Sequence, residues 1–413
     1  MDTSILSDKG YLKINAVSSE TLTPISGATV EISSTGNPNV ILERLTTDSN
    51  GQTDTIALDA PPLEYSMEPS DNQPYSEYNI RITSQDFEEQ LISAVQILPG
   101  ETGIQDFSLN LQTSSQPVFN PIVIGGHTLW EYYPPKIAEA EVKPENESGE
   151  IVLRKVVIPE TIVVHDGVPS DSTARDYYIP YLDYIKNVAC CEIYSTWPEA
   201  TIQANVLAIM SFTLNRVFTE WYRNKNYNFT ITSSTAYDHK WIYGKTIYTK
   251  ISQVVDSLYN NFLARPNVKQ PILTQYCDGK RVTCPNWMSQ WGSKALGDDG
   301  LTASEIIRYY YGSDMYINSA EIISGIPASF PGYNLTIGSR GDAVIQIQQQ
   351  LNRIARNYPA LPSVTADGIY GENTANAVRE FQRVFNLPVS GIVDYPTWYK
   401  ISQIYVGVTK IAE

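Results

Sequence analysis

The chain has 413 residues and a mass of 46.2 kDa, which is larger than one hydrophobic core usually supports and predicts several domains. It contains 42% hydrophobic and 18% charged residues, a composition typical of folded proteins, and its formal net charge is −16. This acidity argues against nucleic acid and anionic membranes as partners. No stretch is apolar enough to predict a membrane span, and the first residues lack the pattern of a secretory signal.

The first part of the chain, residues 1–112, has the pattern of a β-sandwich. Polar and apolar residues alternate in short runs that are separated by turn signals, and these runs predict strands at 11–17, 28–33, 53–58, 78–83, 91–97 and 107–111. The sequences PISGATVEI at 24–32 and TDSNGQT at 47–53 resemble the immunoglobulin-like domains of the Cna B and carboxypeptidase-regulatory types. That resemblance is compatible with a simple spacer as well as with a specific function.

Residues 113–160 differ from the sandwich in composition. They contain the run Tyr-Tyr-Pro-Pro at 132–135 and five glutamates within 139–150. Because proline and like charges oppose a packed core, this segment is predicted to be an exposed acidic linker that a protease can reach.

The pattern becomes helical in residues 161–326, which are predicted to form an α-rich central domain with strand or loop insertions. Apolar residues recur at three- and four-residue steps, which predicts helices at 181–193, 196–222, 250–263 and 303–311. The predicted fold class is therefore multidomain α+β, with an immunoglobulin-like sandwich, this central domain and a helical C-terminal part.

Residues 333–405 predict a compact three-helix domain, with helices at 342–358, 372–385 and 396–404. The glycine-punctuated motifs LTIGSRGDAV at 335–344, DGIYGENTANAV at 367–378 and GIVDYPTW at 391–398 resemble a type 1 peptidoglycan-binding domain. The resemblance implies that peptidoglycan is a partner, and it points to Asp367, Tyr370 and Trp398 as wall-binding residues.

Two blocks of the central domain carry a second resemblance. The first is EIYSTWPEATIQANVLA at 192–208, and the second extends from WMSQWGSKALG at 287–297 to EIIRYYYG at 305–312. In this order they resemble the stage II sporulation protein D family, which includes lytic transglycosylases of peptidoglycan. The match implies that Glu192 is the catalytic acid and that substrate contacts come from Tyr194, Trp197, Asn205, Tyr276, Ser289, Gln290 and Trp291.

One carboxyl group is sufficient for such a reaction. A protonated glutamate gives its proton to the glycosidic oxygen, and the resulting carboxylate then takes the proton of the muramic C6 hydroxyl while a 1,6-anhydro ring closes. A hydrolase (muramidase or glucosaminidase) would need a second carboxylate, for which the sequence offers Glu199, Asp238, Asp278 and Asp298. A non-catalytic wall-binding or morphogenetic protein is the third possibility, because Met210 stands where the family has an arginine.

The order of sandwich, linker, central domain and binding domain resembles the spore cortex-lytic enzymes of the SleC type. This resemblance implies an extracytoplasmic precursor in the spore, which a subtilisin-like germination protease activates by removing the N-terminal part. We expect the cut between residues 141 and 160. We expect neither a cofactor nor a metal, since Cys277, Cys284 and His239 together would make only a partial site.

Overall fold

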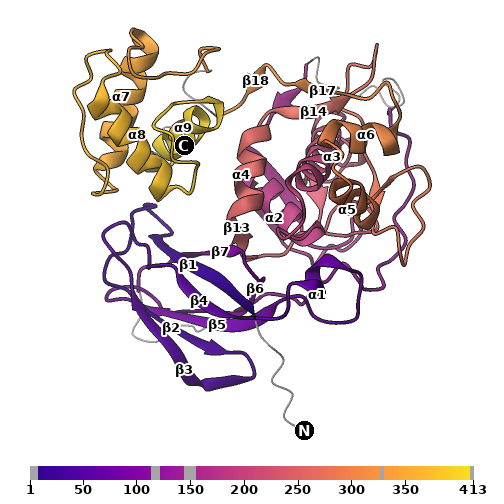
Figure 1. Ribbon diagram of the computed structural model, residues 1–413, viewed down its shortest axis with the longest axis horizontal. Coiled ribbons are helices and arrows are strands. Elements are labelled where there is room, and N and C mark those ends of the chain that lie inside the picture. Colours follow the sequence, from indigo (N-terminus) through magenta and orange to yellow (C-terminus); the bar gives the residue numbers. More distant parts are fainter. Residues whose placement is uncertain (1–7, 113–120, 144–154, 326–329, 410–413) are drawn as a thin grey trace.

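The computed structural model describes residues 8–112, 121–143, 155–325 and 330–409. Figure 1 shows the sandwich, the central domain and the C-terminal helices as three bodies that lie against one another. The multidomain α+β architecture predicted from the sequence is confirmed. Within the described residues, no helix has the length and apolar character that crossing a membrane requires.

Two sheets face each other in the N-terminal domain. Their spatial orders are β4-β1-β7-β13 and β3-β2-β5-β6-β8. Residues 12, 14 and 16 of β1 point into the core between the sheets and are fully buried, as the alternating pattern predicts. The elements are β1 Asp8–Ser18, β2 Thr29–Ser34, β3 Asn37–Thr46, β4 Ile56–Ala60, α1 Glu64–Met67, β5 Ser76–Thr83, β6 Gln90–Ile97, β7 Thr102–Leu109 and β8 Ile122–Val123.

One strand of the first sheet belongs to the central domain. β13 (Ile247–Tyr248) pairs antiparallel with the edge of β7, where Tyr248 lies opposite Gly103. A Cβ atom at Gly103 would lie 2.8 Å from the methyl group of Thr246, so the close approach of the two segments requires glycine here. The amide of Gln105 also donates to the carbonyl of Gly244 at 3.0 Å. The sandwich is therefore bonded edge to edge to the central domain.

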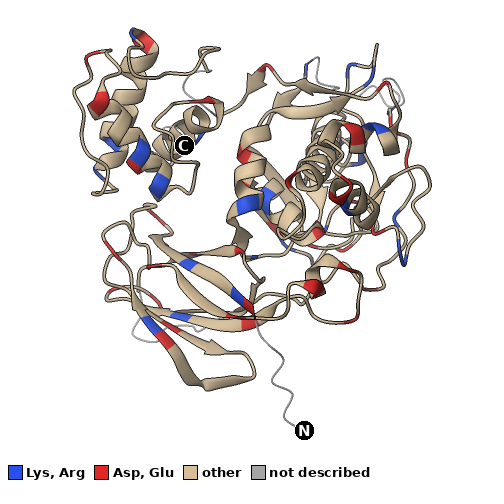
Figure 2. Ribbon diagram, in the orientation of Figure 1, with Lys and Arg blue, Asp and Glu red and all other residues tan. Residues whose placement is uncertain are grey.

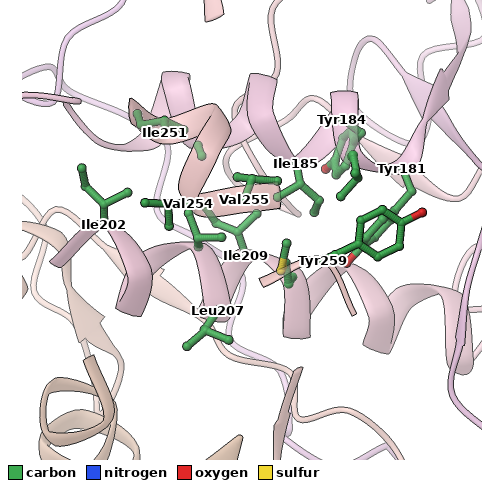
Figure 3. Close-up of a cluster of buried hydrophobic side chains, with 14 of the residues drawn as sticks. Tyr181, Tyr184, Ile185, Ile202, Leu207, Ile209, Ile251, Val254, Val255 and Tyr259 are labelled. Carbon is green, nitrogen blue, oxygen red and sulfur yellow. The ribbon is translucent and has the colours of Figure 1, made fainter. Parts of the chain in front are cut away.

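Helices form the core of the central domain. α2 Tyr181–Glu192, α3 Glu199–Phe218 and α4 Thr249–Leu258 pack together, and α5 Gln290–Asp298 and α6 Ala303–Tyr311 lie against α3. α3 is buried around most of its circumference, because neighbouring elements surround it. Figure 3 shows part of the resulting apolar cluster, which includes Tyr181, Tyr184, Ile185, Ile202, Leu207, Ile209, Ile251, Val254, Val255 and Tyr259.

Short strands connect these helices. β10 forms a three-stranded sheet with β11 and β12, and the remaining strands pair as β14 with β17, β15 with β16 and β9 with β18. The β15–β16 pair is important for the site, because it places Tyr276 next to Met288 and so fixes the start of α5. The bounds are β9 Val157–Ile158, β10 Thr161–His165, β11 Asp176–Pro180, η1 Arg223–Lys225, β12 Ile231–Thr232, β14 Asn261–Ala264, β15 Tyr276–Cys277, β16 Met288–Ser289, β17 Tyr316–Ser319 and β18 Ile322–Ile323.

The C-terminal domain consists of α7 Asp342–Ala355, α8 Glu372–Val384 and α9 Tyr395–Thr409, close to the predicted ranges. It contacts both other domains. The ring of Tyr399 stacks on Tyr259 of the central domain at 4.7 Å between centroids. The Nε2 of Gln52 in the sandwich donates to the carbonyl of Val384 at 2.9 Å.

Some predicted elements differ from the observed ones. The helix predicted at 250–263 ends at Leu258, and residues from its last turn form β14. Among the elements for which no range was predicted are α5 and β3. β3 is exposed along most of its length at the sheet edge, so it lacks the buried alternation that identifies a strand in a sequence.

Replacement of Phe381 by alanine tests the packing of the C-terminal core. The side chain is fully buried among the three helices, so its loss should cost about 3–5 kcal/mol and lower the melting temperature of this domain. Calorimetry of the full chain measures the effect. Tyr333→Ala, which removes an exposed ring, is the matched control and should leave the transition in place.

Candidate active site

Glu192 lies at the end of α2, where its carboxyl group is held from two sides. The backbone N–H of Lys240 donates to its Oε1 at 2.7 Å, and the Nε2 of Gln290 donates to its Oε2 at 2.9 Å. The same amide of Gln290 donates to the Glu192 carbonyl at 2.6 Å. The residue is only 8% exposed. Its carboxyl group is therefore fixed in one orientation by groups from two other segments.

Gln290 reaches Glu192 because of how α5 begins. Ser289 is the N-cap of this helix, and its hydroxyl accepts a hydrogen bond from the N–H of Gly292 at 2.8 Å. The pairing of β16 with β15 then fixes the position of the first helical residue, Gln290. The predicted site residues Ser289 and Gln290 are thus a helix cap and a direct partner of the carboxyl group, respectively.

Aromatic and basic groups surround the carboxyl group. The hydroxyl of Tyr276 faces Glu192, and burial together with the negative charge of Glu192 raises the pKa of this tyrosine well above its usual value. His239 stacks on the Tyr276 ring, with 5.7 Å between centroids, and burial lowers the pKa of His239 well below its usual value. The ammonium group of Lys136 lies 4.3 Å from the centre of the same tyrosine ring. Burial lowers the pKa of Lys136, although the carboxylates of Glu192 and Asp238 oppose this effect.

The carboxyl group of Glu192 faces a small pocket. Residues of the central domain and of the segment 121–143 line this pocket. The contributions of the central domain include Tyr276, Cys277, Asp278 and Gln290. Residues 127–136 supply the opposite wall through His127, Leu129, Tyr133, Pro134 and Lys136. A disulfide between Cys277 and Cys284 closes the loop that contains Asp278. In the described part of the chain, no cluster of three potential metal ligands is present.

The segment 121–143 packs on the central domain, which corrects the prediction of an exposed linker. The hydroxyl of Tyr194 accepts a hydrogen bond from the N–H of Leu129 at 2.9 Å. The indole N–H of Trp291 donates to the carbonyl of Leu129 at 3.0 Å. A ring nitrogen of His127 lies 2.5 Å from the carbonyl of Cys191. Of the other residues predicted for this linker, 113–120 and 144–154 lie outside the described residues, and 155–160 contain the strand β9.

The glutamates Glu139 and Glu141 do not destabilise this segment by mutual repulsion, because each of them pairs with an arginine of the central domain. The guanidinium of Arg216 contacts both carboxyl oxygens of Glu139, at 2.6 and 3.0 Å, and donates to Asp238 at 2.7 Å. Arg265 likewise pairs with Glu141 at 2.9 Å. Figure 2 shows that acidic and basic positions are dispersed over all three domains. Glu139 and Glu141, two of the glutamates that suggested a solvated linker, therefore hold part of it in place.

Several predicted substrate contacts have structural partners instead. Asn205 donates to Ser293 and to the carbonyl of Thr201, both at 2.9 Å, and it is buried. The ring of Trp197 is fully buried, and its N–H donates to the carbonyl of Ser66 in α1 at 2.9 Å. Trp197 therefore packs in the interior of the protein and contacts the N-terminal domain through Ser66.

The candidate second carboxylates lie in different environments. Asp238 is fully buried and accepts hydrogen bonds from Arg216, Tyr222 and Thr232. Asp278 shares the pocket with Glu192, but it accepts backbone N–H groups of its own loop, including that of Val282 at 2.9 Å. Glu199 and Asp298 bond to Gln203 and Lys294, respectively. Among the four, Asp278 alone lines the pocket with Glu192.

The proposed wall-binding residues divide into two groups. Tyr370 and Trp398 lie in the core of the C-terminal domain and present no ring face to a ligand, which corrects the prediction for both. Their aromatic character reflects packing, which a motif match cannot separate from binding. Asp367 accepts hydrogen bonds from the N–H of Ile369 and from Gln348, and these bonds lower its pKa.

Sequence reasoning did not identify several residues of the site, among them His127, Leu129, Tyr133 and Lys136. They belong to the segment predicted to be a linker. The apolar and aromatic residues at 127–133, which precede the glutamate-rich stretch, were the available signal for a packed segment.

Comparison with protein families matches residues 340–401 to a putative peptidoglycan binding domain. The C-terminal part of the chain is therefore a peptidoglycan-binding domain, as its motifs indicated. Among curated proteins, no sequence matches this chain.

Solved structures with local similarity include the SleB N-terminal domain, at 30% identity over 18% of this chain and 93% of that chain, with a TM-score of 0.16. Another is the Bacillus anthracis TIE protein, at 17% identity over 25% of this chain, with a TM-score of 0.19. The minor pilin GBS52 of Streptococcus agalactiae is similar at 15% identity over 27% of this chain, also with a TM-score of 0.19. This chain spans 17% of the TIE protein and 48% of the pilin. At these scores the similarities carry no argument about function.

The ion pairs of Glu139 predict a dependence of stability on pH. Burial alone would raise the pKa of this carboxyl, but Arg216 and Lys143 more than offset burial and lower the pKa below its ordinary 4.5. A lowered pKa in the folded state stabilises the protein above the pKa of the unfolded chain, and this stabilisation is lost as the pH falls through the folded-state value. Glu139→Gln should therefore lower the melting temperature at pH 7 and have a shrinking effect below pH 4.5.

Thermal unfolding of both proteins across this pH range measures the difference. Glu372→Gln, which removes an exposed partner of Arg379, is the matched control and should have little effect at any pH. An effect of Glu139→Gln that stayed constant down to pH 3 would contradict the assignment.

Proposed function

We propose that the chain is the precursor of a lytic transglycosylase that cleaves the glycan strands of spore cortex peptidoglycan during germination. The observation that carries the proposal is the carboxyl group of Glu192, which is buried, fixed by two donors and open to a pocket. The peptidoglycan-binding domain at residues 340–401 supports the same substrate, because it directs the chain to the cell wall.

Glu192 acts first as an acid and then as a base. Its Oε2 carries the proton, while Lys240 keeps its bond to Oε1 and Gln290 keeps its bond to the Glu192 carbonyl. The proton moves to the oxygen that links muramic C1 to the next sugar, and the C1–O bond breaks. The carboxylate then removes the proton of the C6 hydroxyl as O6 bonds to C1. Glu192 is regenerated, and the product ends in a 1,6-anhydro muramic residue.

Tyr276 is positioned to support this cycle. Its hydroxyl faces Glu192, so it can donate to the carboxylate or to a substrate oxygen. His239 stacks on the tyrosine ring and stays neutral because burial lowers its pKa. Both residues therefore orient the site without adding charge to it.

A two-carboxylate hydrolase is the second candidate function. Asp278 favours it, because this residue lines the same pocket as Glu192 and belongs to a loop that a disulfide constrains. The bonds from three backbone N–H groups hold the carboxylate of Asp278 in its loop, which makes it less available as a base.

The precursor part of the proposal rests on the segment 121–143. In the uncut chain, this segment forms one wall of the pocket and contacts Tyr194 and Trp291. A glycan strand needs an open groove, so this segment must move before the substrate can enter. A cut by a subtilisin-like germination protease between 141 and 160, a range that includes residues outside the described ones, would allow the segment to leave.

Replacement of Glu192 by glutamine tests the catalytic role. The change keeps the shape of the side chain and removes the acid, so the release of soluble glycan from cortex by the cut chain should fall by about 10²–10⁴-fold. Glu199→Gln changes a glutamate at the start of the next helix and should retain activity.

Mass spectrometry of the products separates the candidate reactions. Anhydro-muramic ends, each lacking one water, support the transglycosylase. Reducing ends that disappear in Asp278→Asn would instead support the hydrolase. If the cut chain with Glu192 intact and the cut Glu192→Gln variant release equal amounts of glycan, or none, the catalytic proposal is wrong and a wall-binding role replaces it.

A second experiment compares the intact chain with a chain cut once within 144–154. The intact chain should show little release of glycan, because residues 127–136 close the pocket. The cut chain should become active. Equal activity of the two forms from the first time point would show that the N-terminal part does not inhibit the enzyme.

A further inference from the structure

Both polar backbone atoms of Leu129 are bound by side chains of the central domain. The Leu129 N–H donates to the hydroxyl of Tyr194 at 2.9 Å, and the indole N–H of Trp291 donates to the Leu129 carbonyl at 3.0 Å. The two aromatic rings are in edge contact, with 6.1 Å between centroids. Tyr194 and Trp291 together form an aromatic wall, and the backbone of Leu129 donates one hydrogen bond to this wall and accepts one from it.

This wall adjoins the proposed catalytic group. Tyr194 follows Glu192 by two residues, and Trp291 follows Gln290, whose amide donates to the Glu192 carboxyl group. Leu129 and Glu192 line the same pocket. A ligand that replaced Leu129 on the wall would thus lie beside the bond that Glu192 is proposed to cut.

Departure of Leu129 would leave two polar groups in an aromatic environment without their partners. Tyr194 and Trp291 are 8% and 4% exposed in the uncut chain, and Trp291 also packs on the ring of Trp197 at 4.9 Å. A ligand that covers this wall excludes water from it, and a polar group that is then left without a partner is unfavourable, so a ligand that restores both hydrogen bonds is favoured over one that does not. The wall therefore selects for a particular arrangement of donor and acceptor.

We propose that Tyr194 and Trp291 form a subsite for a neighbouring amide N–H and C=O on the muramic side of the glycan, and that Leu129 occupies this subsite in the uncut chain. The inference rests on the proposed function and specifies which chemical groups of the substrate the site recognises. An extended peptide residue presents such a pair of groups, as in the peptide stem of peptidoglycan. A cyclic amide, as in a muramic lactam, presents the same pair because its N–H and C=O lie on one side.

Competition between glycan fragments and the N-terminal piece tests the subsite. The protein is the full Glu192→Gln chain, cut once within 144–154 so that both pieces are present and no turnover occurs. Three muramic fragments are titrated: one with a peptide stem, one with a lactam and one with neither. The release of a fluorescently labelled N-terminal piece gives the half-maximal concentration for each fragment.

We expect an amide-bearing fragment to release the piece at a concentration about three- to tenfold lower than the amide-free fragment. The more effective of the two amide-bearing fragments identifies the source of the amide. Equal concentrations for all three fragments, or no release by any of them, would overturn the proposal.

Three aromatic substitutions separate recognition from packing. Tyr194→Phe and Trp291→Phe each remove one hydrogen-bonding group and keep a ring, so the advantage of the amide-bearing fragment should largely disappear. Tyr248→Phe removes the bond from the Tyr248 hydroxyl to the carbonyl of Gln96 in the N-terminal piece and serves as the matched control. This control should weaken the retention of the N-terminal piece. It should leave unchanged the ratio of the half-maximal concentration of the amide-free fragment to that of the amide-bearing fragment. This ratio does not depend on how tightly the piece itself is held, so a purely structural role of the two residues would not change it.

The test is independent of catalysis. If the cut chain with Glu192 intact fails to cleave glycan but the ratio persists, the proposed reaction is wrong and the subsite stands. If glycan is cleaved and the ratio is one, the reaction stands and the subsite is refuted.

Discussion

The hydrogen bonds to the carboxyl group of Glu192 connect three separate parts of the central domain. They join the end of α2, the start of α5 and the backbone at Lys240, and each of these parts has its own support. The N-cap of α5 and the β15–β16 pair fix Gln290, while the core around α3 fixes α2. The proposed proton transfers require such positioning, because the carboxyl oxygen of Glu192 must lie within hydrogen-bond reach of the glycosidic oxygen.

The same site explains the course of the segment 121–143. Its first residues continue the sandwich as β8, its middle lies in the pocket, and its last described residues pair with Arg216 and Arg265. An ion pair such as that of Arg216 is costly to bury unless each charge has several partners, and Arg216 has both Glu139 and Asp238. The segment is thus held at both ends while its middle faces Glu192.

The fold was predictable where local patterns determine it. The helices α2, α6 and α8 follow from apolar residues at three- and four-residue steps, and the strands of the sandwich follow from alternation. α5 was missed because Gly292 and Gly297 weaken the helical signal and its start depends on a cap. The segment 121–143 was misinterpreted because the partners of its glutamates, Arg216 and Arg265, are distant in the sequence. Such non-local pairs leave no local signal.

Motif resemblance identified Glu192 and Gln290, which the structure brings into contact, but it did not distinguish packing from binding at Trp398 or Tyr370.

The pairing of β13 with β7 has a kinetic consequence for the proposed activation. Cutting one peptide bond leaves this shared sheet intact, so the two fragments stay associated until the sheet separates. The onset of activity should then show a lag whose length is independent of the amount of protease once every chain is nicked, because the dissociation rate of the fragments determines the lag.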